Sequence, residues 1–103
     1  MPEPPIAASC SLDAGELAEQ RERYRRVGRG GRLLERSPRA LNIECAIGTD
    51  SALVEQTLAI ERRCCPFYDL GWDPRARRLS ISVKRSEHEP ALGAIALALG
   101  LMR

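Results

Sequence analysis

The sequence predicts an α+β domain in which helices cover one four-stranded antiparallel sheet. Three observations predict this class. Two pairs of short segments alternate apolar and polar residues, as half-buried strands do. A segment with helical spacing precedes each pair, and an almost wholly apolar segment closes the chain. We therefore expect the order helix, hairpin, helix, hairpin, helix in a single domain over residues 10–103. The Pro-rich lead over residues 1–9 is expected to be disordered or loosely docked.

The first helix is expected from Ser11, a suitable N-cap, to about Val27, where a glycine-rich run ends it. The first hairpin should pair strands over residues 32–36 and 40–47. Apolar residues alternate with polar ones along the second of these strands as far as Ile47, so its inward face should include that residue.

The second helix is expected from Ser51 to Cys65, after a cap at Gly48-Thr49-Asp50, because Pro66 cannot continue a helix. The second hairpin should pair residues 67–72 with residues 79–83 across an Asp-Pro turn. A capping box of Ser86 and Glu89 should then start the last helix, over residues 87–101.

An internal duplication is a further hypothesis. Several residues recur at a spacing of 36, which would make the fold two αββ units with a closing helix, although chance also produces such matches. The matching residues are Leu17, Glu19, Gln20, Arg26, Pro38, Arg39 and Ala40 with Leu53, Glu55, Gln56, Arg62, Pro74, Arg75 and Ala76.

The closing helix is apolar on nearly every side. One side should cover the sheet, whereas Leu97 and Leu101 point elsewhere and need a second burial surface. This pattern favours a homodimer; the alternative is a helix enclosed by elements of its own domain. The residues of the sheet-facing side are Ala91, Leu92, Ile95, Leu99 and Met102.

Composition argues against several classes of protein. The 16 Lys and Arg residues nearly balance the 14 Asp and Glu residues, and the arginine-rich stretch over residues 21–32 is interleaved with glutamates, so we do not expect nucleic acid binding. The apolar stretch over residues 91–102 is too short to span a bilayer, so no membrane partner is expected. Residues 1–5 lack the features of a signal peptide, and a cytoplasmic location is expected.

The adjacent pair Cys64-Cys65 is the unusual feature among the 4 cysteines. No CxxC pair occurs and His88 is the single histidine, so a zinc finger is a poor interpretation. Two close thiolates would bind soft ions such as Hg(II), As(III), Cu(I) or Zn(II). They would equally serve as a nucleophile and a resolving thiol, or simply fill the core.

Glu61 breaks the pattern of the second helix. It falls in the middle of the apolar stripe, one turn before both cysteines. Burial of a carboxylate without a partner costs several kcal/mol, so a functional role is expected. The alternative is a structural role, in which Glu61 forms a buried salt bridge to Arg21 or Arg25 of the first helix or bonds to a backbone donor.

The remaining candidates are weaker. Cys10 would supply a third sulfur if the N-terminal end folds back over the pair; the equal alternative is a flexible, exposed cysteine. Cys45 should fill the core. Tyr24 lies on the inward face of the first helix and would lend a hydroxyl to a site near Glu61. Tyr68 and Trp72 are candidate pocket walls, and His88 is expected to be an exposed cap residue.

The string from Glu61 to Phe67, Glu-Arg-Arg-Cys-Cys-Pro-Phe, together with Cys10 resembles a group of small bacterial proteins with a Glu-x-x-Cys-Cys-Pro-Phe motif. Some members are encoded near mercury- or arsenic-type resistance genes. The resemblance implies a shared site at Cys10, Glu61, Cys64 and Cys65 in a bacterial protein.

Three functions follow as hypotheses. The first is binding or detoxification of a soft metal or metalloid by Cys64 and Cys65, with Cys10 as a third ligand and with proton donation by Glu61 to a carbon–metal bond as its enzymatic form. The second is a metal-free enzyme or organic-ligand protein, for example in a biosynthetic cluster, with Glu61 as acid/base, a cysteine nucleophile and Tyr24 lining its pocket. The third is a dimerisation module whose cysteines merely pack.

Overall fold

The computed structural model describes residues 13–101 and confirms the α+β class. Within these residues, three α-helices accompany one four-stranded antiparallel sheet. The elements in chain order are α2 (Ala14–Gly28), β1 (Arg32–Ser37), β2 (Ala40–Glu44), α3 (Ser51–Cys64), β3 (Tyr68–Asp73), β4 (Arg78–Val83), a 3₁₀ turn η1 (Ser86–His88) and α4 (Glu89–Ala98).

The sheet has the strand order β1-β2-β4-β3, so the second strand of each pair lies at the centre. Ile43 of β2 pairs with Leu79 of β4, and Leu41 pairs with Ile81. These four side chains are buried, because alternate residues of both strands point to the same face. That face forms the floor of the core.

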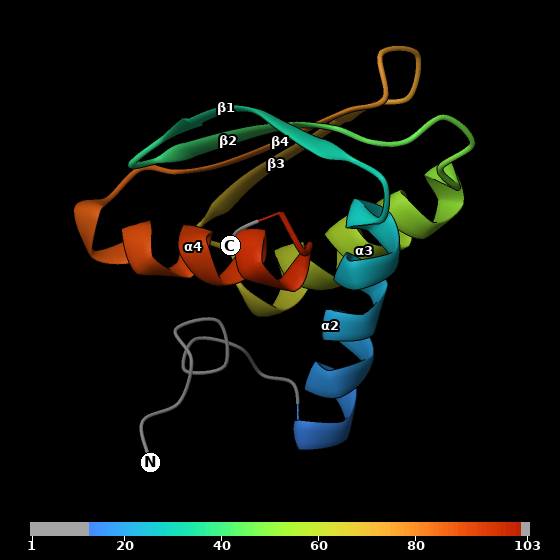
Figure 1. Ribbon diagram of the computed structural model, residues 1–103. Helices are drawn as coiled ribbons and strands as arrows, with labels where there is room; N and C mark the ends of the chain where they lie inside the picture. Colours follow the sequence, from blue (N-terminus) through green and yellow to red (C-terminus); the bar gives the residue numbers. More distant parts are fainter. Residues whose placement is uncertain (1–12, 102–103) are drawn as a thin grey trace.

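All three helices lie on this one face of the sheet (Figure 1). α3 and α4 pack on the strands, and α2 packs on both of these helices. Gly28 permits the close approach of α2 to the end of α4, because a Cβ atom there would lie 2.1 Å from the carbonyl oxygen of Leu99. The inner side of α2 therefore faces α3, and this contact forms the candidate site.

Two predicted boundaries in the first half of the chain are wrong. α2 begins at Ala14, since Asp13 is the N-cap and forms a capping box with Glu16; Ser11 lies outside the described residues. β2 ends at Glu44, three residues before Ile47. The chain turns there through Gly48, whose φ is +87°, and Ile47 is 87% exposed instead of facing the core.

The predicted start of the last helix is also wrong. α4 begins at Glu89 after η1, and no side chain caps its N-terminus, so Ser86 and Glu89 do not form a capping box. Pro90 favours this start because its ring sets a helical φ and its missing N–H is not needed in the first turn. The helix ends at Ala98, and Gly100 follows with a φ of +78°.

The two sides of α4 differ in burial. The sheet-facing residues Ala91, Leu92, Ile95 and Leu99 are buried, whereas Leu97 is 65% exposed. Met102 and residues 1–9 lie outside the described part of the chain. Homodimerisation and internal duplication stay predictions.

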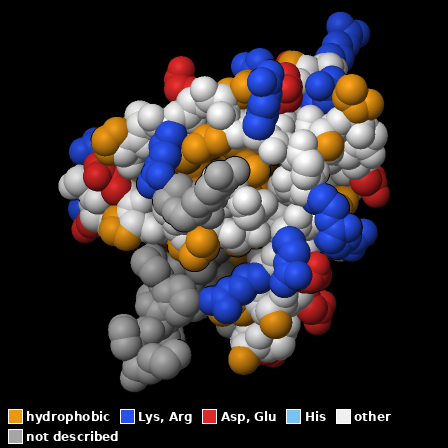
Figure 2. Space-filling model, in the orientation of Figure 1, with side chains coloured by type: hydrophobic (Ala, Val, Ile, Leu, Met, Phe, Trp, Pro, Cys, Tyr) orange, Lys and Arg blue, Asp and Glu red, His pale blue; other side chains and the backbone are white. Residues whose placement is uncertain are grey.

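The surface charges are interleaved. On the face seen in Figure 2, Lys and Arg side chains lie in separate groups with acidic side chains beside several of them. Along α2, Arg23 pairs with Glu19 at 3.5 Å and Arg25 pairs with Glu22 at 3.7 Å, as the helical spacing predicts. None of the described helices combines the length and the apolar character needed to cross a membrane.

Candidate metal-binding site

The structure brings Glu61, Cys64 and Cys65 together at the C-terminal end of α3. A carboxylate oxygen of Glu61 and the two sulfur atoms all lie within 4.8 Å of one another. The three residues are 0%, 5% and 0% exposed, so the group is almost closed to solvent. Glu61 is fully buried although its side chain is a carboxyl group, as its place in the apolar stripe predicts.

Pro66 explains how adjacent cysteines share one site. On a continuous helix their side chains would diverge by about 100°. A residue that precedes proline is disfavoured in the helical region, and Cys65 accordingly leaves the helix with φ −134° and ψ 74°. Its N–H still donates to the Glu61 carbonyl at 2.7 Å, which holds Cys65 against the last turn.

The spacing of the three ligand atoms suits a single ion. Zinc–sulfur bonds are about 2.3 Å long, so two sulfur ligands of one such ion lie at most about 4.6 Å apart. The 4.8 Å limit of this group is close to that span, and small side-chain rotations would close the difference. Cys64 donates its S–H to the Ile60 carbonyl at 3.1 Å, a bond that metal binding would replace.

The two carboxylate oxygens of Glu61 have different surroundings. Oε1 accepts a hydrogen bond from the Tyr24 hydroxyl at 2.7 Å and a longer one from Gln20 Nε2 at 3.4 Å. Oε2 is buried and has no hydrogen-bond partner among the described residues. An orphan buried oxygen of this kind is costly unless a ligand or a proton satisfies it.

Gln20 belongs to the candidate site but was not predicted from the sequence. Its Nε2 donates to the Thr57 carbonyl at 2.9 Å as well as to Glu61, and its Oε1 accepts from Arg23 at 2.9 Å. Arg23 therefore fixes which end of the amide faces Glu61. The sequence pattern that could have predicted this role is the one that singled out Glu61. Gln20 is a polar residue on the inward side of its helix, four positions before Tyr24.

The predicted alternative for Glu61, a buried salt bridge to Arg21 or Arg25, is wrong. Both arginines are exposed on α2, and Arg25 pairs with Glu22. Among the described residues, the side chains that donate to Glu61 are those of Tyr24 and Gln20, which are uncharged.

The environment of Tyr24 keeps its hydroxyl protonated. Burial raises the pKa of Tyr24 well above its usual value of 10.0, and the negative charge and hydrogen bond of Glu61 raise it further. Tyr68 and Cys65 act on the same pKa in the same direction, which indicates that both lie near this hydroxyl. Tyr24 is thus a constant donor to Glu61 at neutral pH.

The two other cysteines lie apart from this group or outside the described residues. Cys10 is among the latter. Cys45 is 1% exposed in the core, and burial raises the pKa of its thiol, partly offset by Arg77. Cys45 therefore fills the core as predicted.

The aromatic candidates and His88 lie in different parts of the structure. Tyr68 is buried, and its hydroxyl donates to the Ala91 carbonyl at 3.0 Å. Trp72 donates to Ser51 at the start of α3, about 20 Å of helix away from Cys64, so it is not a wall of this site. His88 is half-buried, not exposed as predicted, because its ring stacks on Phe67 with centroids 4.2 Å apart.

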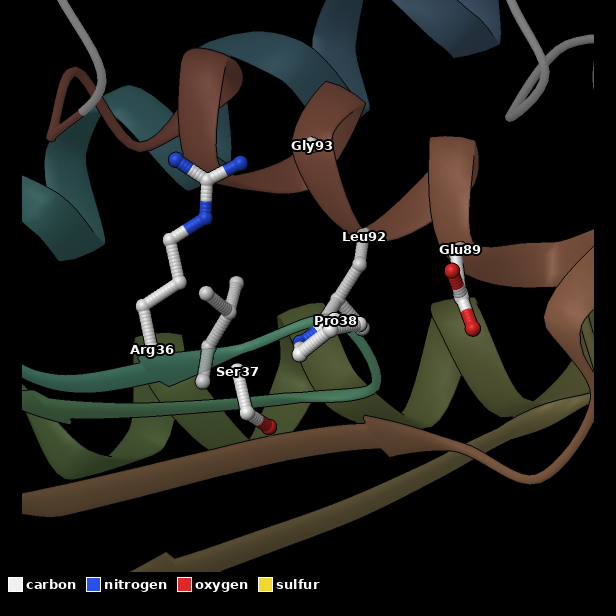
Figure 3. A pocket seen from close by; sticks show the side chains of 7 residues that line it. Arg36, Ser37, Pro38, Glu89, Leu92 and Gly93 are labelled. Carbon is white, nitrogen blue, oxygen red and sulfur yellow. The ribbon is translucent and has the colours of Figure 1, made fainter.

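A separate cavity of about 320 Å³ opens between the β1–β2 hairpin and α4 (Figure 3). Arg36 and Glu89 stand at opposite ends of it, and Leu92 lies between them. Neither Glu61 nor either cysteine of the pair lines this cavity. The candidate site is therefore a buried group of ligands, not the mouth of a large pocket.

Comparison with protein-family models, with curated proteins and with solved structures finds no match to this chain.

Proposed function

We propose that this protein binds a soft metal or metalloid ion through the thiolates of Cys64 and Cys65, with Glu61 beside the ion. One observation carries the proposal: three potential ligand atoms lie within 4.8 Å of one another in a buried position. Thiolate sulfur selects soft ions such as Cu(I) and Hg(II) over hard ions such as Mg(II). The orphan oxygen of Glu61 supports the same proposal, since it leaves a lone pair for the ion or for a proton.

The donor set narrows the class of ion. Structural Zn(II) sites have four protein ligands, whereas this group has three among the described residues. Two thiolates carry two negative charges, and a divalent soft ion would cancel them in a group whose Glu61 has only uncharged donors. We therefore rank ions that accept two or three ligands, of which Hg(II) is the natural probe, above Zn(II).

The resemblance to the Glu-x-x-Cys-Cys-Pro-Phe proteins agrees with this function, and detoxification is the role it suggests. The proposed chemistry for Glu61 is proton transfer next to the bound ion. A carboxylic acid that is held by Tyr24 and Gln20 on one oxygen has the other oxygen available for a proton.

The test is a titration with Hg(II) under reducing, chelator-free conditions, followed by thiolate-to-metal charge-transfer absorption in the ultraviolet. We expect one ion per chain in the native protein, and loss of the absorption in Cys64→Ser and in Cys65→Ser. Cys45→Ala is the matched control, since it removes a buried thiol outside the group and should leave the absorption intact. Equal absorption in all four proteins would contradict the proposal.

Glu61→Gln separates the two roles of the carboxylate. The amide oxygen would still accept from Tyr24, so the fold should survive, while the acid is lost. Retained Hg(II) binding with loss of proton transfer to an alkyl–metal probe would support the acid role. Equal loss of binding and turnover would instead make Glu61 a ligand.

A second candidate is a metal-free enzyme. The observation that favours it is the same orphan carboxylate oxygen close to two thiols, an acid/base beside a nucleophile. It predicts that Cys64 or Cys65 reacts with iodoacetamide faster than the buried Cys45 does, and that Glu61→Gln removes the difference. Slow alkylation of all three thiols would argue against this candidate.

A further inference from the structure

A small cleft lies at the turn that follows the cysteine pair, where the Tyr68 N–H donates to the Cys65 carbonyl at 3.4 Å. It has a volume of about 170 Å³, and its lining begins with Pro66 and Phe67, the two residues directly after Cys65. The Phe67 ring stacks on His88 and lies 4.5 Å from Tyr68, centroid to centroid, so it forms a rigid apolar wall. The complete lining is Pro66, Phe67, Asp69, Lys84, Arg85 and His88.

The polar rim of this cleft is mainly cationic. The ammonium group of Lys84 has no hydrogen bond or ion pair with any described residue, while Arg85 pairs with the exposed Glu87 at 2.6 Å. Asp69 supplies the single carboxylate of the lining. A cleft with this composition favours a small organic anion with an apolar portion.

The proposed metal site needs such a neighbour. Its ligand atoms are almost closed to solvent. A soft ion binds thiols so strongly that it is exchanged between thiolates instead of travelling as a hydrated cation. The donor must therefore place its own metal–sulfur bond next to Cys64, which is 5% exposed and so the least buried of the three ligands.

We propose that this cleft docks a small carboxylate-bearing thiol that delivers the ion as a bis-thiolate complex, an inference that rests on the proposed function. The carboxylates of the carrier contact Lys84 and Arg85, and its apolar stem lies against Phe67. This arrangement gives Phe67, the last residue of the motif, a role that metal binding alone does not give it.

The transfer balances without a redox partner. The thiols of Cys64 and Cys65 form two bonds to the metal, while the two bonds between the metal and the carrier sulfurs break. The two protons that leave the protein thiols end on the two released carrier thiols. The oxidation state of the ion is unchanged.

The experiment compares two donors of Hg(II): its complex with mercaptosuccinate, which bears carboxylates, and its complex with 2-mercaptoethanol, which bears none. The variant is Lys84→Gln/Arg85→Gln, and the matched control is Arg75→Gln/Arg78→Gln, which removes the same charge at the other end of β4. We expect the first variant to raise the half-saturating concentration of the mercaptosuccinate complex about fivefold, the size of effect that two partly exposed charges give. Transfer from 2-mercaptoethanol should stay the same in both variants.

The outcomes separate this inference from the function on which it rests. No transfer to the native protein from either donor would overturn the metal-binding proposal itself. Transfer from both donors with no effect of the Lys84 and Arg85 changes would overturn the docking site alone. An equal loss in the two double variants would mean a general charge effect and would also overturn it.

Discussion

Tyr24 and Gln20 donate to the same oxygen of Glu61. The other oxygen of Glu61 is therefore left to bind a proton or an ion. The occupied oxygen is fixed in place, while Oε2 keeps both lone pairs. Arg23 fixes the orientation of the Gln20 amide and is itself paired with the exposed Glu19. A pair on the surface of α2 thus positions a buried carboxylate on α3.

The raised pKa of Tyr24 predicts that this tyrosine stays protonated at alkaline pH. The chain has two tyrosines, so Tyr68→Phe leaves Tyr24 as the single one. Absorbance at 295 nm should then show no tyrosinate at pH 10, where an exposed tyrosine is half ionised. Half ionisation of the folded variant near pH 10 would contradict the buried Tyr24–Glu61 bond.

The raised pKa of Tyr24 also makes the stability of the fold depend on pH. A folded pKa above the unfolded value of 10.0 stabilises the protein fully below pH 10, and this contribution is lost as pH rises from there through the folded pKa. Tyr24→Phe should lower the free energy of unfolding at pH 7 by about 1–3 kcal/mol, since it leaves a buried carboxyl oxygen without its short hydrogen bond. Urea unfolding should also show a shallower loss of stability above pH 10 in this variant than in the native protein.

At the scale of elements, the end of α3 creates the site. Pro66→Ala removes the restriction on the preceding residue, so Cys65 is free to continue the helix and its sulfur diverges from that of Cys64. We expect roughly a 10-fold loss of affinity for Hg(II) with an unchanged far-ultraviolet circular dichroism spectrum. Native affinity in this variant would show that the proline does not direct the convergence.

The close contact of α2 with α4 predicts opposite effects on stability for two glycine-to-alanine changes, one inside the contact and one outside it. Gly28→Ala places a methyl group 2.1 Å from the Leu99 carbonyl oxygen, so it should lower the free energy of unfolding by about 2–4 kcal/mol. Gly93→Ala in α4 meets no atom within 4 Å and should raise it by up to about 1 kcal/mol. Chemical denaturation of both variants checks the pair, and equal stabilities would contradict the close helix contact.

The strands and helices were predictable from the sequence only in part. Period-two alternation identified β2 and β4 because both strands bury one face. It failed at Ile47, where an apolar residue continues the pattern but the backbone turns at Gly48. The Ser86–Glu89 capping box failed because a 3₁₀ turn precedes α4, and a short motif does not reveal that turn.

At the scale of the whole molecule, the site depends on contacts between distant segments. The misplaced Glu61 and the adjacent cysteines were visible along the chain, and so was the inward position of Tyr24. The prediction that Tyr24 lends its hydroxyl to a site near Glu61 is confirmed by their 2.7 Å hydrogen bond. The contact of Gln20 with Glu61 was not predicted, because it depends on how α2 packs on α3.

Assembly is the remaining prediction at this scale. Leu97 stands on the outer side of α4 at 65% exposure, the side that we expect a second copy to cover. Analytical ultracentrifugation should show a dimer for the native chain and a monomer for Leu97→Asp. Arg21→Asp, an exposed change on α2, should leave the dimer intact. A monomeric native chain would contradict this prediction.

Native mass spectrometry of protein exposed to Hg(II), arsenite or Zn(II) under reducing conditions tests the thiolate site directly. We expect a mass increase of one Hg(II) per chain that is lost in Cys64→Ser and kept in Cys45→Ala. A mass that stays metal-free with all three ions would contradict a thiolate site at Cys64 and Cys65.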